Sequence, residues 1–101
     1  MSNAIAQTIL AQLGGNRFTA MTGARALLDL GDGLQFDLPR GARNCANKVS
    51  VRLTPADLYD VRFMRFNRRT LDVETISQIE GVDAESLRRV FTSATGLETS
   101  L

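Results

Sequence analysis

The chain has 101 residues, 44% of them hydrophobic, and its 12 Lys and Arg side chains against 11 Asp and Glu give a formal net charge of +1. This length predicts a single domain, residues 1–101, built around one hydrophobic core. The chain contains no His and only one cysteine, Cys45, which excludes Ser-His and Cys-His nucleophilic pairs, mixed His/Cys zinc sites and an intrachain disulfide. We therefore expect a protein that is not an enzyme, with no catalytic residues, no metal site and no cofactor.

The N-terminal third predicts one helix followed by less regular elements. Residues 3–13 place Ile5, Ile9 and Leu13 on one helical face, and the Gly14-Gly15 pair ends that pattern. Residues 18–22 predict a short strand that stops at a glycine. Residues 26–30 fit either a strand or a helical turn.

The middle of the chain predicts an antiparallel meander of half-buried strands. The Gly31-Asp32-Gly33 sequence is typical of a hairpin turn. Apolar and polar side chains then alternate over residues 34–38, 48–53 and 58–66, which is the periodicity of strands with one buried face. In this interpretation the core-facing aromatics include Tyr59 and Phe63.

The C-terminal residues 70–101 predict two short helices joined by a tight turn. Val73, Ile76 and Ile79 recur at a spacing of three residues, and Gly81 interrupts the pattern. A second apolar stripe then follows, with Asp83 as a candidate cap and Gly96 as a candidate stop; its members are Leu87, Val90, Phe91 and Ala94.

These elements together predict an α+β fold. We expect an antiparallel meander of three to four strands, with an N-terminal helix and a C-terminal helical pair packed on one face. No apolar run approaches the length of a membrane span, and residues 1–10 lack the basic flank of a signal peptide. The expected location is therefore the cytoplasm of a host cell, with no membrane partner.

Two resemblances suggest biological settings. The segment VETISQIEGVDAESLRRVFTSATGLETS resembles the second helix-turn-helix of AraC-type regulators, which implies that the second helix presents Arg88 and Arg89 to a DNA groove. The stretches QLGGNRFTAMTGA, LQFDLPR, DLYDVRF and VFTSATGLETSL resemble a family of short proteins from tailed bacteriophages and related mobile elements. That second resemblance covers nearly the whole chain and implies a compact fold, but it carries no assigned activity and no site residues.

Charge is unevenly distributed along the chain. Residues 40–69 hold eight cationic side chains against two acidic ones, whereas residues 70–101 hold six acidic side chains against two basic ones. Alternation in the strands predicts that Lys48, Arg52 and Arg62 point away from the core, so that the solvent side of the sheet is cationic. This face either contacts phosphates, with Tyr59, Phe63 or Phe66 as stacking partners, or is an ordinary solvated surface that compensates the acidic helices.

Two functional hypotheses follow. The first is a non-enzymatic accessory protein of a phage or mobile element that binds a macromolecular partner, which we expect to be a host or phage protein. The second is a nucleic-acid-binding regulator. Its candidate contacts are cationic side chains from the loop, the sheet and the last helix: Arg40, Arg43, Arg62, Arg65, Arg68, Arg69, Arg88 and Arg89. An exposed edge strand would also allow two copies of the chain to pair as a homodimer.

Overall fold

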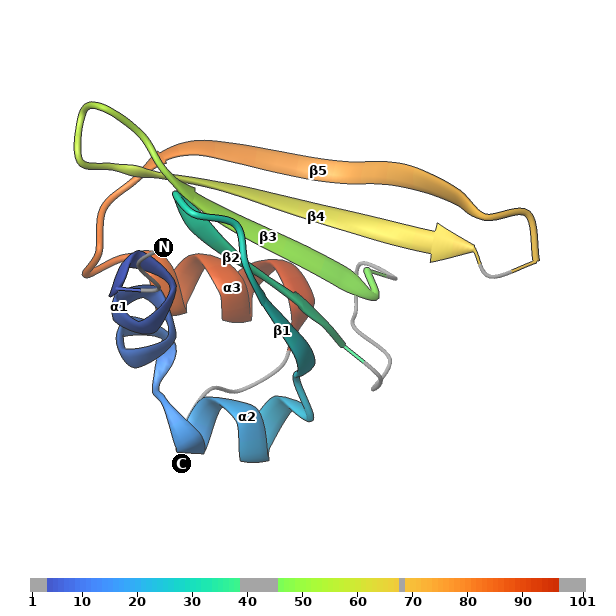
Figure 1. The fold of residues 1–101 in the computed structure, drawn as a ribbon, viewed down its shortest axis with the longest axis horizontal. Helices are drawn as coiled ribbons and strands as arrows, with labels where there is room; N and C mark the ends of the chain where they lie inside the picture. The colour runs from blue at the N-terminus through green and yellow to red at the C-terminus, as the bar shows by residue number, and fades with distance from the viewer. Residues whose placement is uncertain (1–3, 39–45, 68, 97–101) are drawn as a thin grey trace.

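The computed structural model describes residues 4–38, 46–67 and 69–96, which form three helices and one five-stranded sheet. The helices are α1 (Ala4–Leu13), α2 (Asn16–Thr22) and α3 (Leu87–Thr95). The strands are β1 (Arg25–Asp29), β2 (Gly33–Asp37), β3 (Lys48–Leu53), β4 (Tyr59–Asn67) and β5 (Asp72–Val82). The strands pair in chain order as an antiparallel meander, and the helices lie together on one side of it (Figure 1). The fold is thus α+β, as predicted, but the sheet has five strands instead of the three to four expected.

The three central strands form where the alternation predicts them. The residues buried on the side that carries the helices are Leu34 and Phe36 of β2, Val49 and Val51 of β3, and Tyr59, Val61 and Phe63 of β4. We call this side the inner face of the sheet and the opposite side the outer face. The predicted hairpin turn is present, because the backbone N–H of Leu30 donates to the carbonyl of Gly33 at 2.9 Å.

A cluster of four phenylalanines joins the helices to the inner face. Phe18 of α2 makes edge-on contacts with Phe36 of β2 and Phe91 of α3, with ring centroids 5.2 and 5.3 Å apart. Phe63 of β4 is also near Phe91, with ring centroids 6.5 Å apart. Since these rings are at most 1% exposed, they fix α2 and α3 against the centre of the sheet.

The structure corrects the prediction in the N-terminal third. Residues 18–22, predicted as a strand, belong to the helix α2, and the ambiguous stretch 26–30 is mostly the strand β1. The spacing of Phe18 and Thr22 puts both on one buried helical face, and the Thr22 hydroxyl donates to the carbonyl of Phe18 at 2.7 Å. Gly23 ends the helix in the left-handed conformation (φ 73°).

The largest correction concerns the predicted C-terminal helical pair. The second helix is present as α3 and ends at Gly96 as expected, but the first is the 11-residue strand β5. Two irregularities in the pairing of β5 with β4 each add one residue to β5. Ile76, Ile79 and Val82 therefore reach the core at a spacing of three instead of two, which imitates a helical stripe. The described part of this segment contains one helix, so it does not form a helix-turn-helix pair.

Candidate interaction site

The end of the β4–β5 hairpin that carries its turn extends past the rest of the sheet (Figure 1). Pairing between β3 and β4 stops at Lys48 and Met64, so the following residues of β4 pair with β5 alone. Across this extension Arg65 faces Glu74, Phe66 faces Val73 and Asn67 faces Asp72. We call residues 65–67 and 69–74 the arm.

The turn at the tip of the arm is organised by Asn67. Its side-chain oxygen accepts hydrogen bonds from the backbone N–H of Arg69 at 2.8 Å and of Thr70 at 3.3 Å, and its carbonyl accepts from Leu71 at 2.7 Å. Such Asx turns are a common solution where a chain reverses. Leu71 then adopts a positive φ of 63°.

Apolar side chains are exposed at this tip. Leu71 is 72% exposed and Val73 is 54% exposed. A left-handed conformation normally selects Gly or Asn, because a Cβ in that conformation approaches the backbone carbonyl. The fold therefore holds a large apolar residue in a strained conformation and in contact with solvent, and neither burial nor backbone preference accounts for its presence.

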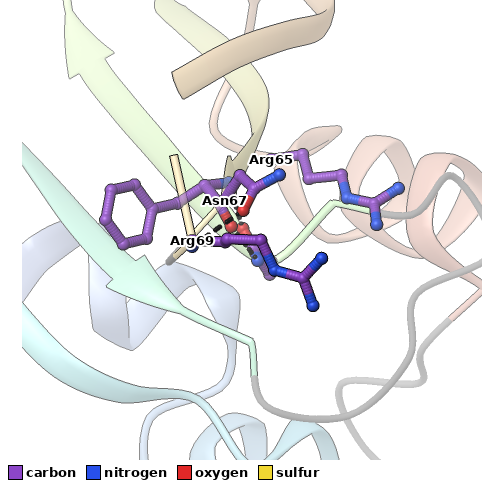
Figure 2. Close-up of a pocket in the computed structure, with 5 residues that line it drawn as sticks. Arg65, Asn67 and Arg69 are labelled. Atoms are coloured by element: carbon purple, nitrogen blue, oxygen red, sulfur yellow. Dashed lines mark hydrogen bonds between the residues drawn. The ribbon is translucent and has the colours of Figure 1, made fainter. Parts of the chain in front are cut away.

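Two arginines on the inner face of the arm form one side of an open pocket of about 490 Å³. The pocket is lined by Asn47, Arg65, Phe66, Asn67 and Arg69. Figure 2 shows the guanidinium groups of Arg65 and Arg69 extending to the same side of the hairpin. Within the described residues neither guanidinium makes an ion pair or a hydrogen bond, although Glu74 is the cross-strand neighbour of Arg65.

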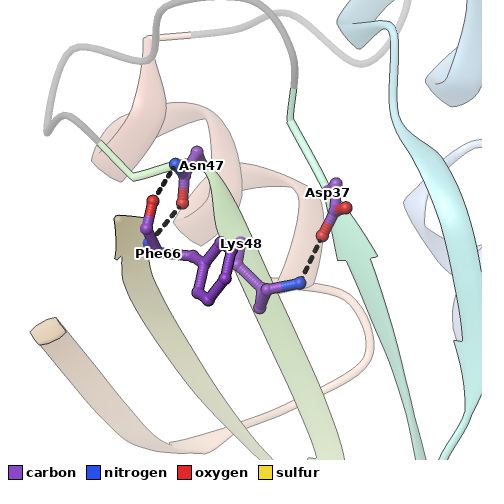
Figure 3. A network of polar contacts seen from close by, with 4 residues as sticks. All are labelled: Asp37, Asn47, Lys48 and Phe66. Carbon is purple, nitrogen blue, oxygen red and sulfur yellow. Dashed lines mark hydrogen bonds and ion pairs between the residues drawn. The ribbon is translucent and has the colours of Figure 1, made fainter. Parts of the chain in front are cut away.

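Asn47 attaches the base of the arm to the sheet. Its side chain accepts from the backbone N–H of Phe66 at 2.7 Å and donates to the carbonyl of the same residue at 2.9 Å (Figure 3). The amide thereby continues the pairing of β4 by one step beyond Lys48. On the outer face the Lys48 ammonium lies 5.8 Å from the centre of the Phe66 ring, so the ring and the Arg65 side chain lie on opposite faces of β4.

The outer face of the sheet is less cationic than its strands indicate. Lys48 forms an ion pair with Asp37 at 2.6 Å (Figure 3), and Arg52 forms one with Asp32 at 2.7 Å. The interpretation that Tyr59 and Phe63 are buried is confirmed, since they are 5% and 0% exposed. Neither ring is therefore available to stack on a base.

The predicted nucleic-acid contacts do not gather on one described surface. Arg62 is exposed on the outer face of β4, three residues from Arg65 on the inner face. Arg88 and Arg89 are exposed on α3, where Arg89 donates to the Ser86 hydroxyl at 3.0 Å. Of the candidate arginines in the described residues, Arg65 and Arg69 line one common pocket. Three other candidates lie outside the described residues: Arg40, Arg43 and Arg68.

Asp83 acts just ahead of α3 rather than at its cap position. Its carboxylate accepts from the backbone N–H of Ser86 at 2.8 Å, and Ser86 is the residue that precedes the helix. The hydrogen bonds from the Ser86 side chain and backbone, with a smaller contribution from the nearby Arg89 charge, lower the pKa of Asp83 below its ordinary value. The ionised carboxylate of Asp83 therefore stabilises the turn that leads into α3.

Two other features are absent from the described residues. Among the residues whose placement is described, no three His, Cys, Asp or Glu side chains gather in a way that could hold a metal ion, and Cys45 lies outside those residues. In the same ranges no helix has both the length and the apolar character needed to cross a bilayer.

No protein-family model, no curated protein and no solved structure matches this chain. A functional assignment must therefore rest on the geometry of the arm and on the chemistry of its side chains.

Proposed function

We propose that this chain is a small non-enzymatic accessory protein of a phage or mobile element, and that its arm binds a protein partner. The observation that carries the proposal is the combination found at the tip: a hairpin that extends beyond the core, with Leu71 at 72% exposure and Val73 at 54%. Folding gains little from apolar side chains that remain in water, whereas a protein interface gains by covering them.

The backbone of the arm offers a second means of recognition. β5 is an edge strand, and it pairs with β4 on one side only. An edge strand presents unpaired N–H and C=O groups that can accept an added strand from another chain. An exposed edge next to exposed apolar side chains is the arrangement that an extended segment of a partner protein would recognise.

Self-association through β5 is less well supported. Antiparallel pairing of two β5 strands about Ser77 would place Glu74 of each copy opposite Glu80 of the other, because each lies three residues from the centre. Like charges directly opposite each other destabilise a strand pair. The acidic side chains of β5 therefore oppose self-pairing in this register.

The alternative, a nucleic-acid-binding regulator, has weaker support. Binding to a phosphate backbone requires several cations on one surface. Here Lys48 and Arg52 are each paired with an aspartate, and Arg62 faces away from Arg65. Asp72 and Glu74 also lie on the arm close to Arg65, where they would repel neighbouring phosphates.

Affinity capture with matched variants tests the proposal. Val73→Glu places a charge on the arm, and Leu28→Glu places one on the opposite edge of the sheet, where Leu28 is 51% exposed against 54% for Val73. We expect the wild-type protein and Leu28→Glu to retain a protein partner from the host lysate, and Val73→Glu to lose it. Equal capture by both variants, or recovery of nucleic acid alone, would contradict the proposal.

A further inference from the structure

The pocket beside Arg65 and Arg69 contains donors whose partners are missing. Both guanidinium groups are without an ion pair or hydrogen bond in the described residues, and the Asn67 side-chain nitrogen likewise makes none there. The orientation of the Asn67 amide is fixed, because its oxygen accepts two backbone hydrogen bonds from the turn. Its NH₂ group is therefore left as a donor.

Three acceptors of the described residues at the same pocket already accept hydrogen bonds. The Asn47 side-chain oxygen accepts from Phe66, the Phe66 carbonyl accepts from Asn47, and the Asn67 carbonyl accepts from Leu71. Among the described residues, this pocket of about 490 Å³ holds two cations, a free amide NH₂ and no side-chain oxygen without a hydrogen bond, a set that is complementary to an anion. The two positive charges of the arginines repel a cation.

We infer that this pocket binds a single carboxylate from an acidic side chain of the protein partner. The inference rests on the proposed function for the source of the carboxylate, but the pocket itself is independent of it. Guanidinium groups match a carboxylate with two parallel hydrogen bonds, so one or both arginines can engage the two oxygens. Arg69 extends towards the pocket from the turn at the tip of the arm, and Arg65 extends towards it from strand β4 (Figure 2).

The acidic residues near the pocket limit the size of the anion. A second depression, of about 380 Å³, lies beside the first and is lined by Arg65, Asn67, Thr70, Asp72 and Glu74. A nucleic-acid strand carries a repeating charge and would bring further phosphates towards these two carboxylates. A single carboxylate needs only the first pocket, whose described lining includes neither Asp72 nor Glu74, and the exposed Leu71 in the same turn as Arg69 suits an apolar neighbour of that group in a protein.

Titration of the isolated full chain by NMR tests this inference without any partner. The probes are the capped peptide acetyl-Gly-Asp-Gly-amide, its neutral analogue acetyl-Gly-Asn-Gly-amide, and a twelve-residue oligothymidylate. We expect the aspartyl peptide to shift the Arg65 and Arg69 side-chain Nε–H signals and the Asn67 NH₂ signals, with saturation on the order of millimolar concentrations, as for a single charge-assisted contact. The asparaginyl peptide should leave these signals unchanged.

Three variants complete the experiment. Arg65→Gln and Arg69→Gln should each weaken binding of the aspartyl peptide by about tenfold or more, the loss expected when one charge-assisted hydrogen bond is removed. Arg62→Gln is the matched control, because it removes a cation from the opposite face of the same strand. It should retain wild-type affinity.

The possible results separate the two proposals. Unsaturable shifts, equal shifts with the asparaginyl peptide, or equal weakening in Arg62→Gln would overturn the carboxylate site. Tighter binding of the oligothymidylate than of the aspartyl peptide, lost in Arg65→Gln and Arg69→Gln, would overturn the choice of a carboxylate and assign the pocket to phosphate. Each of these failures leaves the capture results for Val73→Glu and Leu28→Glu standing, since that experiment does not depend on the pocket.

Discussion

Replacement of Leu71 by glycine should make the protein more stable and less able to bind. Leu71 has a φ of 63° and its side chain is 72% exposed. A residue with a Cβ costs about 1–2 kcal/mol in the left-handed conformation, whereas glycine costs about 0.5–1 kcal/mol in additional chain entropy on folding. The midpoints of these two ranges differ by about 0.75 kcal/mol, which predicts that Leu71→Gly raises the free energy of unfolding by about 0.5–1 kcal/mol.

Urea and thermal denaturation measure this effect. For a chain of this length, a gain of about 0.5–1 kcal/mol corresponds to a rise in Tm of about 2–8 °C. Leu71→Ala is the matched control, because alanine keeps the strained conformation and removes the same exposed apolar group. Its stability should lie within about 0.5 kcal/mol of the wild type, as is usual for exposed positions.

The two variants also separate stability from binding. Both lack the leucine side chain, so both should capture less of the partner, although only Leu71→Gly gains stability. That combination would identify Leu71 as a residue retained for interaction at the expense of stability. A Leu71→Gly protein that is no more stable than Leu71→Ala would refute the argument from backbone strain, and unchanged capture by both would refute the role assigned to the side chain.

Three further predictions concern the scaffold that carries the arm. A Cβ at Gly33 would lie 2.1 Å from the Val51 carbonyl oxygen, so Gly33→Ala should lower the free energy of unfolding by about 1–3 kcal/mol; an unchanged urea midpoint would contradict this close approach of β2 and β3. Thr22→Val should cost about 1–3 kcal/mol, because the buried hydroxyl also accepts from the N–H of Ala24 at 3.2 Å, while Thr19→Val, at a less buried hydroxyl, should cost clearly less in the same assay. The folded-state pKa of Asp83 is lowered, so the contribution of its carboxylate to stability is present above the unfolded-state pKa and is lost as the pH falls through the folded-state pKa. An NMR titration that gives Asp83 an ordinary or raised pKa would contradict the hydrogen bonds from Ser86.

Sequence reasoning recovered the regular part of the fold. The strands β2, β3 and β4 each bury one face, so their side chains alternate along the sequence and a period of two is easy to recognise. The helix α1 was recognised for the corresponding reason, since Ile9 and Leu13 lie one helical turn apart and are both fully buried.

Local irregularity explains what the sequence could not reveal. The bulges in β5 changed its apolar spacing from two to three, and a bulge depends on the pairing partner as much as on the strand itself. The helix α2 has seven residues, too few for its period to outweigh the strand preference of Phe18 and Thr22. In both places the tertiary packing, rather than the local sequence, decided the conformation.

The candidate site was predictable only in part. Arg65 and Arg69 were among the eight candidate arginines, but no pattern distinguished them from Arg62, because their selection requires the pairing of β4 with β5. Asn47 was missed since its role is to pair with the backbone of Phe66, 19 residues away. Leu71 lay at the start of residues 70–101, which were interpreted as two short helices, and its positive φ has no sequence signal.

Site-directed photo-crosslinking in host cells that express the protein tests most directly whether the arm binds a protein partner. A photoreactive amino acid would replace Val73 or Thr75 on β5 and, as controls, Leu28 on β1 or Ser93 on α3, all of which are exposed. The account predicts that positions 73 and 75 give the same discrete protein adduct and that positions 28 and 93 give none. Adducts from position 93 but not from positions 73 and 75, or adducts with nucleic acid from the arm, would contradict it.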